Sequence, residues 1–149
     1  MKEKIEKFLK GNNFLPLNKW NYFEIIHKSI PPDNREKKND FKKIRDQLLA
    51  KNGLYIYEKN KKIIYVGKGK PMFNRIKNHY ILAYQELPGD SKNKIWHKFF
   101  SRKTNLGKLK VYWKEQEEEK VRQIIEKMLD YILKPKFNSF FKKYENCKI

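Results

Sequence analysis

The apolar positions of the chain favour helices in its N-terminal third, strands in its middle and a long helix near its C-terminus. The segment from residue 20 to 27 carries a short amphipathic pattern, formed by Trp20, Phe23, Glu24 and His27. Pro31 and Pro32 end this pattern, because proline cannot continue a helix from the residue before it. We therefore expect a short helix over residues 20–27.

A second helix is predicted to follow Asp33, which suits the N-cap position. Glu36 lies three residues later and completes a pair that resembles a capping box. The apolar side chains that follow have the spacing of one buried stripe: Phe41, Ile44, Leu48 and Leu49. Gly53 comes after the end of this stripe, so we expect the first strand to begin there.

Two short strand-like segments in the middle of the chain, residues 53–55 and 65–67, carry one tyrosine each. If Lys59-Asn60-Lys61 closes them into a hairpin, Glu58 faces Lys62 and Tyr55 faces Tyr65 across the ladder, on one side of the sheet. A loop without the first of these three residues shifts the register by one and sends the two tyrosines to opposite faces. Whether the phenols stand together depends on this turn.

Further elements follow the hairpin. Pro71 suits the first turn of a helix, and the predicted core stripe of this helix is Met72, Phe73, Ile76, Tyr80 and Ala83. A loop over residues 87–90, a short helix over 95–100 and a third strand over 109–113 come next. The last helix is the clearest, because Pro135 ends one continuous apolar face formed by Val121, Ile124, Ile125, Met128, Leu129 and Ile132.

The chain has 149 residues, which favours one domain with its own core. Its 36 Lys and Arg against 17 Asp and Glu give a formal net charge of +19, which points to a polyanionic partner, nucleic acid first. An AT-rich genome, which encodes Lys and Asn freely, is the alternative. This alternative explains less well why residues 59–80 and 91–110 contain basic side chains and no acidic ones. Candidate DNA contacts in these stretches are Lys68, Lys70, Lys77, Arg102 and Lys103.

The single cysteine, Cys147, excludes an internal disulfide framework and a cysteine-based zinc site. This composition is typical of a reducing compartment. The N-terminal residues lack the apolar run of a secretory signal, and no stretch has the roughly 18 apolar residues of a membrane span. We therefore expect a cytoplasmic protein without membrane association.

Candidate chemistry lies on two of the predicted helices. Arg75 and His79 are one helical turn apart, so they project from the same side and can reach a shared ligand. A guanidinium fork suits phosphate, and a nearby histidine can donate or accept a proton. A lone Arg and His more often mark solvent-exposed surface, but the two tyrosines upstream favour a site. Glu126 lies beside the apolar face of the last helix, where it is either an ordinary helix-edge charge or a ligand of Mg²⁺.

These residues, taken together, resemble the motifs of the GIY-YIG nuclease family. The matching residues, in family order, are Gly53-Leu54-Tyr55, Tyr65-Val66-Gly67, Arg75, His79, Glu126 and Asn138. Leu54 and Val66 replace isoleucines of the family pattern, and both changes keep an apolar side chain. The resemblance covers roughly residues 53 to 138. Each motif is weak alone, whereas their common order and spacing are specific.

The resemblance implies an α/β domain of the α+β type, with a small three-stranded antiparallel sheet flanked by helices. Residues 53–149 would form this nuclease domain, and residues 1–52 would be a helical N-terminal extension packed on it. The implied activity is cleavage of double-stranded DNA at a phosphodiester bond, with one Mg²⁺ or Mn²⁺ per active site. Glu126 would bind the metal, and Asn138 would support the site.

The resemblance also implies a role for each remaining motif residue. Tyr55 would help to activate the attacking water as a base or a relay, and Tyr65 would position that water. Arg75 would stabilise the charge on the pentacovalent phosphate, and His79 would assist proton transfer or hold the phosphate.

A phenol with an ordinary pKa of about 10 is a poor base at neutral pH. It needs nearby positive charge, or a water bound to the metal, to take part in proton transfer. We take Lys68 and Lys70, which follow Tyr65 closely in the sequence, as the hypothetical source of that charge.

The compact chain resembles stand-alone, restriction-type members of the family, so a site-specific endonuclease is the favoured interpretation. A less selective nuclease of a phage, a mobile element or a repair system is close behind. A DNA-binding module without catalysis and an enzyme directed at RNA are the remaining alternatives. One active site per chain suggests a homodimer on DNA, or sequential nicking, for a double-strand break.

Overall fold

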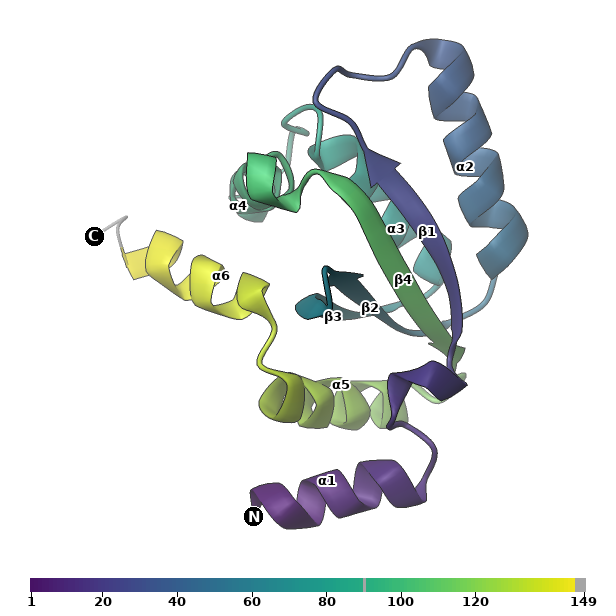
Figure 1. Ribbon diagram of the computed structural model, residues 1–149, viewed down its shortest axis with the longest axis vertical. Helices are drawn as coiled ribbons and strands as arrows, with labels where there is room; N and C mark the ends of the chain where they lie inside the picture. The colour runs from purple at the N-terminus through teal and green to yellow at the C-terminus, as the bar shows by residue number, and fades with distance from the viewer. Residues whose placement is uncertain (90, 147–149) are drawn as a thin grey trace.

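The computed structural model describes residues 1–89 and 91–146, and its framework is one antiparallel sheet (Figure 1). Four strands form this sheet in the order β1, β4, β2, β3. Their bounds are Asn21–His27 for β1, Gly53–Lys59 for β2, Lys62–Gly69 for β3 and Gly107–Glu115 for β4. The three predicted strands lie within β2, β3 and β4, but the expectation of a three-stranded sheet is wrong by one strand.

The additional strand is β1, which occupies the segment predicted to be a helix. It pairs antiparallel with β4 along its whole length. Phe23, Ile25 and His27 are buried, whereas Tyr22 and Ile26 are exposed. This alternation has the period of two that marks a strand with one buried face. The predicted helix over residues 20–27 is therefore wrong, because the spacing of its apolar residues fits a half-buried strand better.

β1 precedes Gly53, so the sheet that carries the tyrosines includes part of the predicted N-terminal extension. The expectation that this extension is purely helical is wrong for the same reason. Its helical parts are α1 (Lys2–Gly11), a 3₁₀ turn (Leu17–Lys19) and α2 (Asn34–Leu48). The division of the chain into residues 1–52 and 53–149 stays a prediction.

The remaining helices follow the hairpin. They are α3 (Met72–Leu82), α4 (Lys92–Phe100), a 3₁₀ turn (Lys103–Asn105), α5 (Glu119–Leu133) and α6 (Lys136–Asn146). The Asp33 carboxylate accepts a hydrogen bond of 2.8 Å from the backbone N–H of Glu36, which confirms the predicted cap of α2. Leu49 follows the end of α2 and is 57% exposed, so the prediction that it belongs to the buried stripe is wrong. α6 has no counterpart among the predicted helices.

The helices cover the two faces of the sheet. One face, with Tyr55 and Tyr57, packs against side chains of α2, α3 and α4. The other face, with Leu54 and Ile56, packs against α5, and α1 lies on the far side of α5 (Figure 1). β3 forms one edge of the sheet, and α6 runs from the end of α5 towards α4. Helices from both faces therefore meet beside β3.

A tight turn sets the pairing of β2 with β3. Asn60 and Lys61 both have positive φ, 51° and 64°, as the common two-residue hairpin turn requires. The three-residue loop, with Glu58 opposite Lys62, is therefore wrong.

A bulge in β3 then keeps the tyrosines together. The observed pairs include Tyr55 with Gly67, Tyr57 with Tyr65 and Glu58 with Ile63. Ile64 is thus an extra residue in β3, and it lies in the same core as Tyr65. Tyr55 and Tyr65 share one face, as expected, but they do so because of this bulge, and they are diagonal neighbours instead of a directly opposed pair.

Two further expectations concern the chain as a whole. No helix within residues 1–89 and 91–146 is long and apolar enough to cross a membrane. Cys147, on which the expected reducing compartment rests, lies outside the described residues.

Neighbouring isoleucines of β1 provide a test of this strand. We expect Ile25→Ala to lower the free energy of unfolding by about 2–4 kcal/mol, because it leaves a cavity under the sheet. Ile26→Ala, at a side chain that is 53% exposed, should change it by about 0.5 kcal/mol or less. Urea unfolding of both variants measures the difference. Equal losses would mean that the two residues do not lie on opposite faces of a strand.

His27, at the end of β1, is a buried imidazole without a hydrogen-bond partner among the described residues. Its ring packs edge-on against Tyr80 and Tyr84. Burial, with a smaller contribution from Lys59, lowers the pKa of His27 from 6.5 to about 4. The unfolded chain therefore binds the proton more readily than the folded chain. The contribution of the neutral His27 to the free energy of unfolding is fully present above pH 6.5 and is lost as the pH falls towards 4.

We expect His27→Phe to remove this part of the acid sensitivity, because phenylalanine keeps the ring packing and does not titrate. Between pH 6.5 and 4, wild type should lose roughly 3 kcal/mol more stability than the variant. Urea unfolding at a series of pH values measures both curves. Parallel curves would show that another group causes the loss.

Candidate active site

The edge of β3 is hollowed where α4, α5 and α6 meet it. This first hollow has a volume of about 480 Å³. Its lining includes Tyr65 of β3, Trp96 of α4, Glu126 and Asp130 of α5, and Phe137 and Asn138 of α6. Three residues of the predicted site, Tyr65, Glu126 and Asn138, are thus brought together from segments far apart in the sequence.

A cluster of three tyrosines lies against this hollow, on the α3 side of the sheet. The ring centroids of Tyr55, Tyr57 and Tyr65 are 5.5 to 5.9 Å apart. Gly67 makes room for them, because a Cβ there would lie 2.5 Å from Cζ of Tyr55 and 2.6 Å from Cε2 of Tyr65. Tyr57 is absent from the predicted site, although its position two residues after Tyr55 on one strand indicates the same face.

The phenols of Tyr55 and Tyr65 remain protonated at neutral pH. The Tyr55 hydroxyl is buried and has no hydrogen-bond partner among the described residues. Burial raises the pKa of Tyr55 well above its ordinary value and raises the pKa of Tyr65 to about 12. The positive charge of Arg75 opposes the rise in pKa of both tyrosines, so its guanidinium is close to both phenols. It forms no hydrogen bond of good geometry with the Tyr55 hydroxyl.

His79 is buried within the aromatic cluster. Its Nδ1 lies 2.9 Å from the Tyr57 hydroxyl, and its ring stacks on Phe100 and lies against Trp96. Burial, and then the charge of Arg75, lower the pKa of His79 well below 6.5, so the imidazole is neutral at physiological pH.

Arg75 is exposed and lines a second, smaller hollow of about 170 Å³. The lining of this second hollow is Lys68, Gly69, Lys70, Arg75, Glu119 and Arg122. Arg75 and His79 therefore do not meet at one ligand, although they are one turn apart on α3. Val66 lines the first hollow and Lys68, two residues further along β3, lines the second, so the two hollows lie close together.

Glu126 is the half-buried carboxylate of the first hollow. Burial raises its pKa, and Asp130 adds to the rise, whereas Lys68 and Arg75 oppose it. A divalent cation would offset the charge that burial makes costly. Mg²⁺ commonly takes one or two protein carboxylates and completes its shell with water and phosphate oxygens, for which the hollow has room. Glu126 therefore fits this ion, although the described residues contain no cluster of three or more metal-ligating side chains.

Asp130 also lines the first hollow and is absent from the predicted site. Burial raises its pKa, and a hydrogen bond from the exposed Asn138 side chain opposes the rise. Its Oδ1 has no hydrogen-bond partner among the described residues. The sequence contains a signal for this residue, because Asp130 follows Glu126 by one helical turn and so shares its face of α5.

The five predicted DNA contacts fall in three places. Lys68 and Lys70 line the second hollow. Lys77 packs over phenylalanine rings of α2 and α3 and lines neither hollow. Arg102 lies over a phenylalanine ring of α6, and Lys103 begins the second 3₁₀ turn; both are exposed.

The solved structures to which the chain is similar include the GIY-YIG N-terminal endonuclease domain of UvrC from Thermotoga maritima. The magnesium-bound form is 24% identical, covers 64% of this chain and 94% of its own, and has a TM-score of 0.41. An asparagine-to-alanine variant bound to its catalytic divalent cation is also 24% identical, covers 64% and 93%, and has a TM-score of 0.42. No family model matches the chain, and no curated protein matches it.

The close approach at Gly67 predicts a sensitive position. We expect Gly67→Ala to lower the free energy of unfolding by about 1–3 kcal/mol, because the added methyl group overlaps the rings of Tyr55 and Tyr65. Gly11→Ala is the matched control, since a Cβ there meets nothing within 4 Å. Thermal or urea unfolding measures both changes. A Gly67→Ala protein as stable as the control would contradict the packing described here.

Proposed function

We propose that the protein is a metal-dependent DNA endonuclease of the GIY-YIG type. The observation that supports this most is the approach of Tyr65, Arg75 and Glu126 at the edge of β3, from a strand and two helices. Hydrolysis of a phosphodiester needs a ligand for a metal ion, positive charge for the phosphate and groups that handle the proton of the attacking water. These three side chains, with Tyr55, supply such groups.

Glu126 is the proposed ligand of one Mg²⁺ or Mn²⁺. Bound there, the ion would act as a Lewis acid on the phosphate and would acidify a water. Asp130 adds negative charge beside Glu126, and Asn138 holds Asp130 by a hydrogen bond. Asn138 therefore supports the site through Asp130.

Tyr55 is proposed as a proton relay and not as a standing base, because burial keeps its phenol protonated. Its hydroxyl is buried, lines neither hollow and has no hydrogen-bond partner among the described residues, so the proposed relay reaches the water through Tyr65, which lines the first hollow. Arg75 stabilises negative charge on this hydroxyl and on the phosphate. Tyr65 lines the first hollow and positions the water.

His79 is proposed as a positioning residue. A buried, neutral imidazole does not suit the binding of a phosphate, whereas its contact with the Tyr57 hydroxyl holds the tyrosine cluster in place. This assignment keeps His79 in the site and moves its role from the phosphate to the tyrosines.

Double-stranded DNA is the proposed substrate, because the net charge of +19 favours a polyanion and both hollows are lined by lysines. Site-specific, restriction-type cleavage is the proposed form of the activity, and a homodimer on DNA is the proposed way to cut both strands. Incubation with supercoiled plasmid and Mg²⁺ tests the activity, and sequencing of the ends tests its specificity.

We expect Glu126→Gln to abolish the nicking of supercoiled plasmid in Mg²⁺, because the amide cannot supply the charge that holds the ion. DNA binding in EDTA should stay close to that of wild type. Glu118→Gln, at an exposed glutamate just before α5, is the control and should cut normally. A Glu126→Gln protein that cuts at the wild-type rate would place the metal elsewhere.

A DNA-binding module without catalysis is the second candidate, and the charge of the chain favours it equally. The half-buried Glu126 counts against it, because a carboxylate in that position opposes the binding of a polyanion. Binding of DNA without nicking in Mg²⁺ or Mn²⁺, at several salt concentrations, would support this second candidate. A parallel digest of structured RNA tests whether RNA is the substrate.

A further inference from the structure

Arg122 of α5 is a buried cation that forms no ion pair among the described residues. It is 3% exposed, and its Nη1 donates to the carbonyl oxygens of Gln116 and Glu117 at 2.8 and 2.7 Å. The ion pairs within residues 1–89 and 91–146 do not include it. The two carbonyls accept hydrogen bonds from the guanidinium but carry no net negative charge to neutralise it. An anion is the ligand that such a group favours.

The second hollow concentrates positive charge around Arg122. Lys68, Lys70 and Arg75 also line it, and Glu119 is the one acid among its lining residues. The four cations come from β3, the loop after it, α3 and α5, so the fold brings them together. Cations held at this density around a small hollow repel one another, and a bound phosphate would relieve that repulsion.

The position of the second hollow indicates which phosphate it would take. Lys68 and Arg75 line this hollow and also act on Glu126 in the first one. A DNA strand carries one charge per roughly 3.4 Å along the helix axis. Val66 lines the first hollow and Lys68, two residues further along β3, lines the second, so a strand whose scissile phosphate lies at Glu126 would bring an adjacent phosphate close to the second hollow.

We propose that the second hollow is a subsite for a backbone phosphate next to the one that is cleaved, with Arg122 at its base and Lys70 at its exposed side. The proposal rests on the proposed nuclease function, which supplies the strand. Arginine suits the buried position because its fork binds phosphate oxygens in two places. The subsite fixes the position of the strand relative to Glu126 and carries no sequence information.

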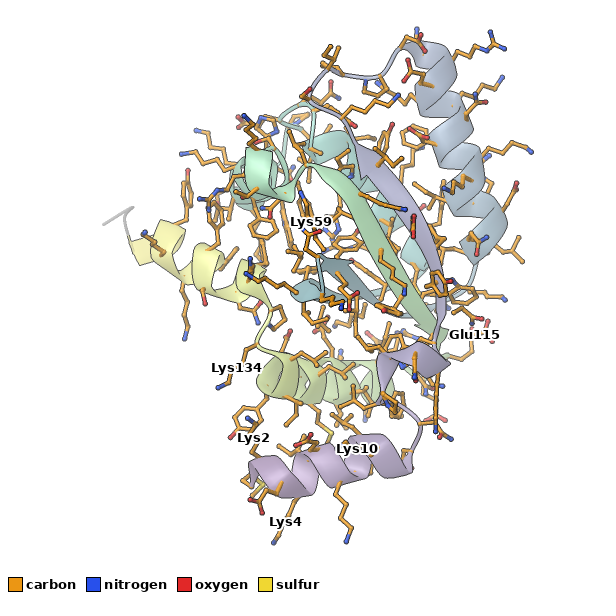
Figure 2. The ribbon with its side chains drawn as sticks, in the orientation of Figure 1. Lys2, Lys4, Lys10, Lys59, Glu115 and Lys134 are labelled. Atoms are coloured by element: carbon orange, nitrogen blue, oxygen red, sulfur yellow. The ribbon has the colours of Figure 1, made fainter. Side chains whose placement is uncertain are left out.

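Lys70 and Glu119 provide the test, because Arg122 also donates to two backbone carbonyls and its replacement would leave both without this donor. Binding of a fluorescein-labelled DNA duplex is measured by anisotropy in EDTA over a range of KCl concentrations. We expect Lys70→Gln to weaken binding about two- to fivefold at low salt. The slope of log K against log salt should fall by about 0.9 for the one phosphate contact that is lost. Lys4→Gln, on α1 at the far side of α5, should match wild type (Figure 2).

Glu119→Gln should change the DNA affinity in the opposite direction to Lys70→Gln, and misfolding would not produce tighter binding. Removal of the acid that lines the subsite should tighten binding about two- to fivefold, and more than Glu118→Gln does at the neighbouring position outside the hollow. A wild-type slope in Lys70→Gln, or equal effects of Glu119→Gln and Glu118→Gln, would overturn the subsite.

Cleavage of plasmid in Mg²⁺ is a separate measurement that keeps the two proposals apart. If the wild-type protein nicks DNA and Lys70→Gln retains the wild-type slope, the proposed nuclease function stands and the subsite is overturned. If the protein does not nick DNA but its binding responds to Lys70 and Glu119 as described, the nuclease function is overturned and a phosphate site stands. A protein that binds no duplex in EDTA overturns the subsite.

Discussion

The pairing of β2 with β3 is the constraint on which the whole site depends. The tight turn at Asn60 and Lys61 would by itself send Tyr55 and Tyr65 to opposite faces, and the extra residue Ile64 brings them back to one face. The ring of Tyr55 then fits only because Gly67, its partner across the ladder, has no side chain. A change of one residue in this pairing would turn a tyrosine away from α3 and from Arg75.

The same pairing separates two electrostatic environments across a single edge strand. On the α3 side, burial keeps the phenols and the imidazole of His79 uncharged. At the edge of β3, the positive charges of Lys68 and Arg75 oppose the rise that burial causes in the pKa of Glu126. The uncharged phenols and imidazole thus lie next to the charged side chains at the edge of β3. In the proposed nuclease, this is the boundary at which a water and a phosphate would meet.

Local signals in the sequence correctly indicate several elements. Asp33 caps α2, Pro135 follows the end of α5, and the two tyrosine segments are strands. They fail at β1, where a short run of apolar residues fits either a helical stripe or an alternating strand. Pairing with β4, a strand distant in the sequence, stabilises the second conformation. Neither the fourth strand nor its place in the sheet follows from local spacing.

The chemical groups of the site, their order along the chain and the large positive charge can be read from the residues alone, because they are properties of residue types. Which of these groups come together depends on the packing of the folded chain. It buries His79 and exposes Arg75, one turn apart on α3, because one side of that helix packs on the sheet. It also adds Asp130 to the first hollow and Arg122 to the second. Burial and electrostatic coupling arise from contacts between distant segments, which the local pattern does not contain.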